Sequence, residues 1–257
     1  MEWSRIKTIL ICLLLFVNLY LGFSVVSKLS EQSSAEEDML YDACSILESR
    51  GISFPSEMLL DMPKYLNSYD FPRDISLEKE VASGILGNCG ENMPGGEIYV
   101  YSADNDSLTF RSGGYIEAVF DQQFEEDDLE ALLADKLVNG LDCESESGGY
   151  SLTFNGFPVR GAQVSVSDGG SSFSGKWVFS REVLKGSQSM SRAELALAMG
   201  NILRNSGQSS IKEVSAVYIH QASQSGGVSL VPAWKISCPR GEVMYINALT
   251  GQKMPIS

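Results

Sequence analysis

The sequence contains very little of what most catalytic and metal sites are built from. Among 257 residues there is one histidine, His220, in the alternating run VSAVYIHQA, with no nucleophile motif such as GxSxG beside it. The glycine-rich pieces GNCGENMPGG and SESGGY lack the lysine of a phosphate-binding loop. We therefore expect a non-enzymatic protein with no metal and no cofactor, in which His220 is a structural or surface residue.

Basic residues are also scarce. The chain has 19 Lys and Arg against 33 Asp and Glu, a net charge of −14. It has no run of basic residues and no aromatic residues interleaved with basic ones, which is the pattern that nucleic-acid binding requires. Such a chain repels phosphate backbones, so nucleic acid is excluded as a partner.

Cysteines are few and widely spaced. Cys12 lies in an apolar run, and no two of the five cysteines have the CxxC spacing by which zinc sites usually take paired ligands. Two disulfides in any of three connectivities, buried free thiols, or a metal site all stay open. The four cysteines concerned are Cys44, Cys89, Cys143 and Cys238.

The N-terminal region has no charge over residues 8–27, TILICLLLFVNLYLGFSVVS. A helix of that length spans about 30 Å, the thickness of the hydrocarbon core of a bilayer. Arg5 and Lys7 precede it directly, so the positive-inside bias places residues 1–7 in the cytoplasm. We expect a single-pass protein of the cell membrane with an extracellular ectodomain.

A cleaved signal peptide is the rival interpretation of this segment. Its apolar core is usually about 7–15 residues and ends at small residues of the A-x-A kind. Here the uncharged run is longer and no alanine occurs before Ala35, although Gly22 and Ser24 imitate a cleavage site weakly. The pattern favours the uncleaved anchor.

Asn18 and Gly22 stand out within the apolar segment. They are one helical turn apart, so they share a face of the predicted helix. An Asn can hydrogen-bond a neighbouring helix, and a Gly lets two helix backbones approach closely. We take this pair as the candidate partner-binding face, the alternative being a single Asn that the bilayer merely tolerates.

The rest of the chain alternates helical and strand-like patterns. After a polar tether at 28–33, a capping box at Ser34 and Glu37 starts a helix that ends at Gly51, with Met39, Ala43, Ile46 and Leu47 as its apolar face. Further helices are expected at 76–86, at 125–138 and from the capping box of Ser191 and Glu194 onward.

Short strands with tight turns lie between these helices. The predicted strands are EIYVYS, SLTFRS, GYIEAVF, YSLTF, PVRGAQVSVS, SFSGKWVFS, VSAVYIHQA, VSLVPAWKISC and EVMYINALTG. Helices segregated from strands indicate an α+β fold with antiparallel sheets. We expect an N-terminal transmembrane helix followed by two tandem sheet-plus-helix subdomains, at 34–124 and 125–257.

Three motifs resemble the YycI family, membrane-anchored accessory regulators of the WalK-type cell-wall sensor kinase of Gram-positive bacteria. The opening MEWSRIKTILICLLLFVNLYL is similar to the family's N-terminus, and FNGFPVRGAQVSV, at 154–166, is similar to its Asn-Gly turn before a long strand. The ending LVPAWKISCPRGEVMYINALTG, at 230–251, resembles both its C-terminal hairpin and PepSY-type domains. In that motif the alternation places Trp234 in the core.

The resemblance implies a regulator that controls cell-wall metabolism through a two-component sensor histidine kinase. Its partners would be the kinase's transmembrane helices and a YycH-like sibling regulator. If the PepSY-like ending is decisive instead, the chain is an extracytoplasmic binding or inhibitory module for a cell-wall hydrolase or protease. An envelope enzyme is a third class, which requires titratable residues clustered in a cleft.

Overall fold

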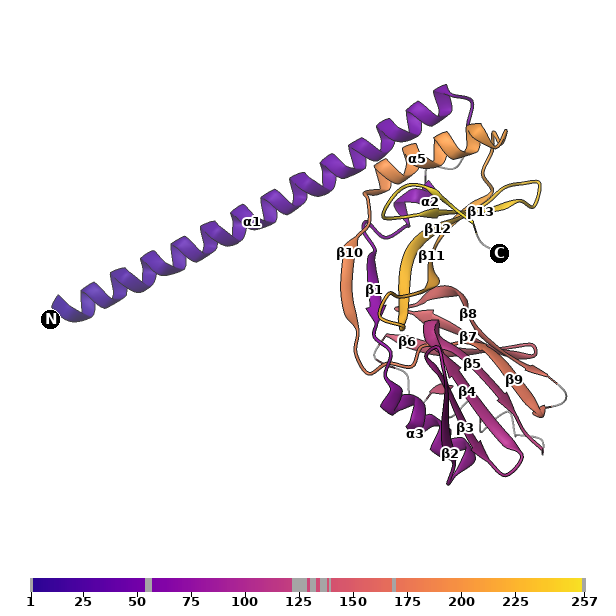
Figure 1. Cartoon of the computed structure of the whole chain (residues 1–257). Helices are drawn as coiled ribbons and strands as arrows, with labels where there is room; N and C mark the ends of the chain where they lie inside the picture. The colour runs from indigo at the N-terminus through magenta and orange to yellow at the C-terminus, as the bar shows by residue number, and fades with distance from the viewer. Residues whose placement is uncertain are drawn as a thin grey trace.

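A computed structural model gives the architecture (Figure 1). It describes residues 2–53, 57–121, 129, 133–134, 138, 140–167 and 170–255, without the side chains of residues 2–6, 8, 9, 12 and 28–34. The described helices are α1 (Glu2–Ser49), α2 (Glu57–Leu60), α3 (Ile75–Leu86), the 3-10 turn η1 (Ser112–Gly114) and α5 (Arg192–Asn205). Most of the helix predicted at 125–138 lies outside the described residues, although Leu129 and Leu133 are described and buried.

The strands described form one large mixed sheet of 14 strands. They are β1 (Asn67–Phe71), β2 (Gly90–Gly95), β3 (Ile98–Ala103), β4 (Asp106–Arg111), β5 (Tyr115–Val119), β6 (Leu141–Glu146), β7 (Gly149–Phe154), β8 (Phe157–Ser167), β9 (Ser172–Lys176), β10 (Leu184–Gln188), β11 (Glu213–Ala222), β12 (Val228–Ser237), β13 (Val243–Asn247) and β14 (Lys253–Met254). The main path is β10-β1-β12-β11-β8-β9-β5-β4-β3-β2, with β13 and β14 added beyond β12 and β6 and β7 beyond β8.

The expectation of purely antiparallel sheets is wrong at one pairing. Strands β8 and β11 run parallel, with Tyr218 opposite Val159 and Ile219 opposite Arg160. Parallel neighbours need a long crossover connection, and here the chain between them passes through β9, β10 and α5. The α+β class itself is confirmed, with a sheet that is mixed.

The predicted tether at 28–33 is also wrong, because α1 runs without a break from Glu2 to Ser49. The polar residues there indicated a separate helix beginning at a capping box. Nothing in 28–33 is a proline or glycine, so no residue stops the helix from continuing. In Figure 1 this one helix extends far from the folded body at its N-terminal end and lies beside α5 at its other end.

Two large hydrophobic clusters fill the body. The first surrounds Trp177 under β3–β5, β7–β9 and α3, and the second surrounds Trp234 between α1, α5 and β11–β13. Trp234 is only 1% exposed, which confirms its prediction as a core residue. Each cluster takes side chains from both sides of the division expected at 124/125, and that division stays a prediction.

Candidate functional site

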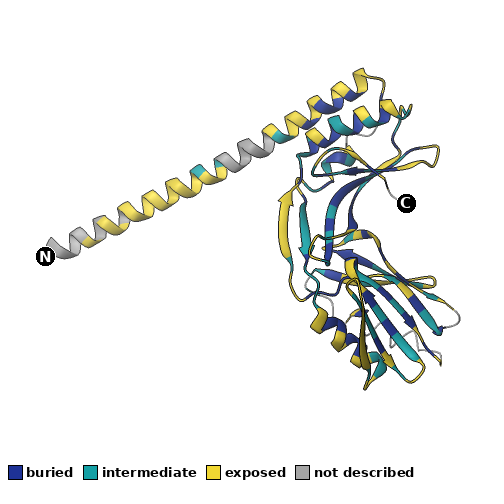
Figure 2. Cartoon of the chain, viewed as in Figure 1, coloured by how far each residue is buried: buried dark blue, intermediate teal, exposed yellow. Residues whose placement is uncertain are grey.

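The N-terminal half of α1 presents its apolar side chains to the surroundings. The described large hydrophobic residues of this stretch are all 45% exposed or more, which Figure 2 shows as the mostly exposed part of the helix. They are Leu10, Ile11, Leu13, Leu14, Leu15, Phe16, Val17, Leu19, Tyr20, Leu21, Phe23, Val25 and Val26. Taken over the residues that the structure describes, no helix is both long and apolar enough to cross a membrane.

The predicted pair Asn18 and Gly22 lies within this stretch. Both residues are exposed, and the space where a side chain at Gly22 would stand holds no atom within 4 Å. At 100° per residue, Asn18 and Gly22 point to the same side of α1 as Leu40 and Leu47, which face the folded body. The structure places the pair on one accessible helix face, whereas its role in binding stays a prediction.

The C-terminal half of α1 is fixed to the body. Leu40, Ala43, Cys44 and Leu47 are buried in the second cluster, against α5. The contact is close because a Cβ added at Gly200 of α5 would overlap the Cδ2 atom of Leu47. The apolar N-terminal half is thus joined to the folded body through one packed helix pair.

An open groove lies between α1, α5 and the segment before β1. Its volume is about 480 Å³, and it is lined by Met39, Asp42, Ala43, Ile46, Tyr65, Ser191, Ala193, Glu194 and Leu197. The sequence placed Met39 and Ile46 on the buried face, but Met39 is 52% and Ile46 is 40% exposed. The groove was missed because the apolar stripe of α1 is wider than the face that α5 covers.

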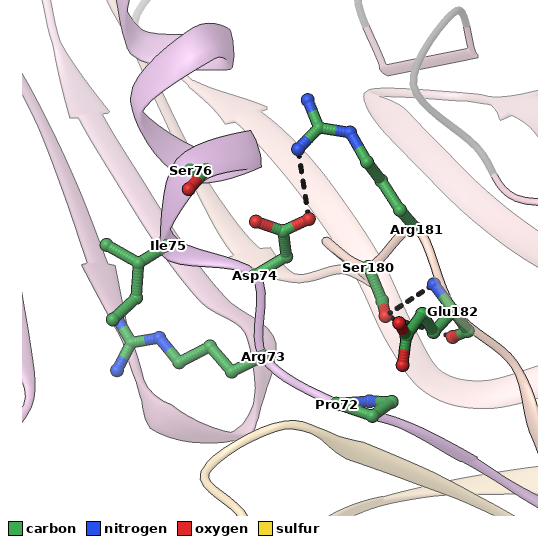
Figure 3. A pocket seen from close by; sticks show the side chains of 8 residues that line it. All are labelled: Pro72, Arg73, Asp74, Ile75, Ser76, Ser180, Arg181 and Glu182. Atoms are coloured by element: carbon green, nitrogen blue, oxygen red, sulfur yellow. Dashed lines mark hydrogen bonds and ion pairs between the residues drawn. The ribbon is translucent and has the colours of Figure 1, made fainter.

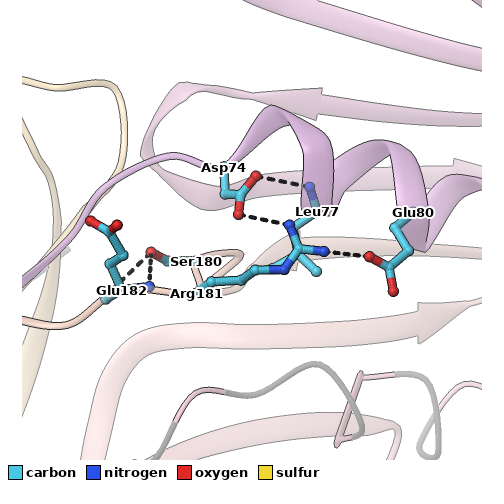
Figure 4. Close-up of polar contacts among 6 residues, drawn as sticks. All are labelled: Asp74, Leu77, Glu80, Ser180, Arg181 and Glu182. Carbon is cyan, nitrogen blue, oxygen red and sulfur yellow. Dashed lines mark hydrogen bonds and ion pairs between the residues drawn. The ribbon is translucent and has the colours of Figure 1, made fainter.

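A second, more polar pocket lies where α3 begins, and Figure 3 shows the residues that line it. Asp74 caps α3 by accepting a hydrogen bond from the backbone N–H of Leu77, at 3.0 Å. Arg181 donates to Asp74 at 3.0 Å and also to Glu80 (Figure 4). These contacts tie the start of α3 to the loop that precedes β10.

Beside this pocket lies a buried ion pair. Arg73 donates from Nε to Glu78 Oε1 at 2.7 Å and from Nη2 to Oε2 at 3.0 Å, with side-chain exposures of 9% and 3%. Burial raises the pKa of Glu78, and the hydrogen bonds from Arg73 act against that rise. Arg73 is thus paired with Glu78, and Arg181 with Asp74 and Glu80. These ion pairs fix α3 to the segment before it and to the loop that precedes β10.

His220, expected to be a structural or surface residue, is a buried residue of β11. Among the described residues neither of its ring nitrogens has a hydrogen-bond partner. Burial, reinforced by the positive charge of Lys176, lowers the pKa of His220 to about 4. Its imidazole is therefore neutral at pH 7 and contributes to the packing of the protein interior.

We expect this histidine to make the fold acid-sensitive. The unfolded chain takes up a proton at His220 below about pH 6.5, whereas the folded chain does so only below about pH 4, so stability falls between these values by about 3 kcal/mol. His220→Leu should remove that share of the pH dependence, measured as urea unfolding at pH 7 and pH 4.5. Equal pH dependence in both proteins would contradict the assignment.

Three of the cysteines outside the apolar run, Cys44, Cys89 and Cys238, are free thiols in this structure. Cys44 and Cys238 are buried in the second cluster, and burial raises the pKa of both thiols. Within the described part of the chain, no group of three or more His, Cys, Asp or Glu is arranged to hold a metal ion.

No family model and no curated protein matches this chain. Two solved structures resemble it distantly. An uncharacterized protein from Eubacterium rectale gives a TM-score of 0.37 at 15% identity, over 76% of this chain and 87% of the other. The C-terminal domain of YpeB from Bacillus megaterium gives 0.32 at 13%, over 73% and 98%. These similarities assign no family.

Proposed function

We propose that this chain is a non-enzymatic, membrane-anchored regulator of the YycI type. It acts on a sensor histidine kinase that controls cell-wall metabolism. In this proposal residues 8–27 cross the membrane, residues 1–7 are cytoplasmic, and the folded body lies outside the cell beside a YycH-like sibling regulator. The anchor is inferred from the sequence of 8–27 as a whole, including residues 8, 9 and 12, whose side chains are not described.

The observation that carries the proposal is the continuity of α1. One helix bears the exposed apolar residues at its N-terminal end and is packed into the core of the body at its other end. An event sensed by the body can therefore bias the N-terminal end without passing through a flexible joint. Regulation of a kinase needs only a contact that differs between two states of the kinase.

The face formed by Asn18 and Gly22 is where we expect the kinase helices to bind. Replacing both with leucine removes a hydrogen-bonding group and fills the space that close backbone approach needs. The kinase recovered with the full-length protein from crosslinked membranes should fall about tenfold, since contacts of this kind contribute about 1–2 kcal/mol. The ectodomain should keep its unfolding transition.

A matched control exists on the same helix. Tyr20→Leu combined with Ser24→Leu changes two residues at the same spacing but about 200° around the helix from Asn18. This variant should retain the kinase. The proposal fails if both double variants lose the bound kinase and the signalling response. It also fails if neither variant loses them.

A further inference from the structure

The groove between α1 and α5 exposes several apolar side chains on the folded body. Met39 and Ile46 contribute from α1, Ala193 and Leu197 from α5, and Tyr65, 40% exposed, from the segment before β1. Apolar side chains gathered in one open depression of a folded surface are typical of interaction sites. This surface is separate from the apolar N-terminal half of α1.

The two helices that form the groove run in the same direction. Near its start, residues 39–43 of α1 share the groove with residues 193–197 of α5, and further along Arg50 donates to Asn201 at 3.3 Å. Side-by-side helices leave a channel between their ridges into which a third helix packs. From Met39 to Ile46 the channel covers two turns, about 10 Å of helix.

Acidic groups stand on both helices that line this channel. Asp42, on α1, has no ion-pair partner among the described residues. Glu194, on α5, accepts from the backbone N–H and the hydroxyl of Ser191, both at 2.8 Å and both through Oε2, so its charge is held in place without a cation. By contrast, Glu36, outside the groove, is paired with Lys64 at 3.1 Å.

We propose that the groove binds an amphipathic helix of a partner protein, one with an apolar stripe flanked by Lys or Arg. The apolar stripe packs on Met39, Ile46 and Leu197, and the basic flanks meet Asp42 and Glu194. An apolar channel with unneutralised acidic groups on both of its walls is complementary to such a helix in shape and in charge. The assignment goes beyond the proposed function, because it concerns the ectodomain and does not need residues 8–27.

A designed peptide tests the groove without the kinase. The probe is a fluorescent 18-residue helical peptide with leucines on one face and lysines beside them, added to the full chain in phosphatidylcholine nanodiscs. A second peptide has the same composition with the leucines respaced so that no stripe forms. Fluorescence anisotropy should show saturable binding of the striped peptide only, above the signal from empty nanodiscs.

Single substitutions distinguish binding at the groove from a general attraction of the basic peptide to the acidic chain. Ile46→Asp should weaken binding about tenfold or more, as expected for an apolar residue at the centre of a contact. Asp42→Lys should weaken it about threefold to tenfold, since an exposed attraction becomes a repulsion. Met39→Ser, at a position 52% exposed, replaces Ile46→Asp if the latter alters the unfolding transition.

The matched control is Glu37→Lys. It makes the same charge change on α1 but about 140° around the helix from Asp42. Binding by this variant should stay within about twofold of the parent, because an exposed charge outside the contact contributes little. Equal weakening by Glu37→Lys and Asp42→Lys, or equal binding of the two peptides, would overturn the proposal. Neither result bears on the kinase experiment, so the two proposals fail separately.

Discussion

Replacing Arg73 with methionine is expected to destabilise the folded chain by about 3–5 kcal/mol, the cost of removing one partner from a buried ion pair. Glu78 is 2% exposed, and the guanidinium of Arg73 donates to both of its carboxylate oxygens. Methionine fills much of the same space but leaves the carboxylate buried without a countercharge. Urea unfolding at pH 7 measures the loss.

Arg181→Met is the matched control. Arg181 also binds two carboxylates, those of Asp74 and Glu80, but its side chain is 50% exposed. Solvent screens such pairs, so a loss of about 1 kcal/mol or less is expected. Similar losses in the two variants would contradict the importance we give to burial.

The Arg73→Met defect should also shrink in acid. Burial already raises the pKa of Glu78, and removing Arg73 takes away the group that opposes the rise. The folded variant therefore binds a proton at Glu78 at a higher pH than the unfolded chain does. Its stability should increase relative to the parent as the pH falls toward the unfolded pKa of about 4.3, where the buried group becomes neutral.

Truncating Leu47 is expected to cause the second large loss in the free energy of unfolding. Leu47 is fully buried between α1 and α5, so Leu47→Ala is expected to cost about 2–5 kcal/mol through lost burial and the cavity left behind. Because Leu47 belongs to the hydrophobic contact between α1 and α5, the C-terminal end of α1 should also become more open to amide hydrogen exchange. Thermal or urea unfolding gives the magnitude, and exchange gives the location.

The neighbouring residue supplies the control. Ile46→Ala changes a similar side chain that is 40% exposed, and about 1 kcal/mol or less is expected. Gly200→Ala offers a second test, since its new methyl group would overlap Leu47 Cδ2 in the parent but in Leu47→Ala meets Ile52 Cδ1 at an ordinary contact distance of 3.6 Å. The methyl should therefore be more favourable in the truncated background, and additivity of the two changes would argue against direct packing.

The elements with strong local signals were predictable. The capping box of Ser191 and Glu194 is present as expected and opens α5. Asn155 and Gly156 both have positive φ, as the hairpin turn between β7 and β8 requires. Helix α3 lies at the predicted place, with Asp74 as its cap.

The edge strands were not predictable from side chains. Every residue of β2 (GENMPG) and of β10 (LKGSQ) is exposed, so neither strand shows an alternation of apolar and polar residues. Both are held by backbone pairing, β2 to β3 and β10 to β1. A strand that buries none of its side chains shows no periodic pattern from which a strand can be predicted.

The two candidate binding surfaces also differ in how far the sequence predicts them. Asn18 and Gly22 stood out because a polar and a small residue interrupt an apolar run, and both lie exposed in the structure. The α1–α5 groove depends on which side of α1 faces α5, and that choice is made by tertiary packing around Gly200 and Leu47. Periodicity gives the width of an apolar stripe, but it does not tell how much of the stripe a neighbour covers.

Because α1 is one unbroken helix, it can tilt as a rigid rod about the place where it packs against α5. From the packed residues near Ala43 to Leu10 the helix is about 50 Å long. A tilt of about 10° about Ala43 moves Leu10 by roughly 9 Å, close to the spacing between the axes of two packed helices. The same tilt moves Asn18 and Gly22, which lie about 31–38 Å from Ala43, by roughly 6 Å. In the proposed regulator, a small repacking around Gly200 is therefore expected to change which partner helix this face contacts.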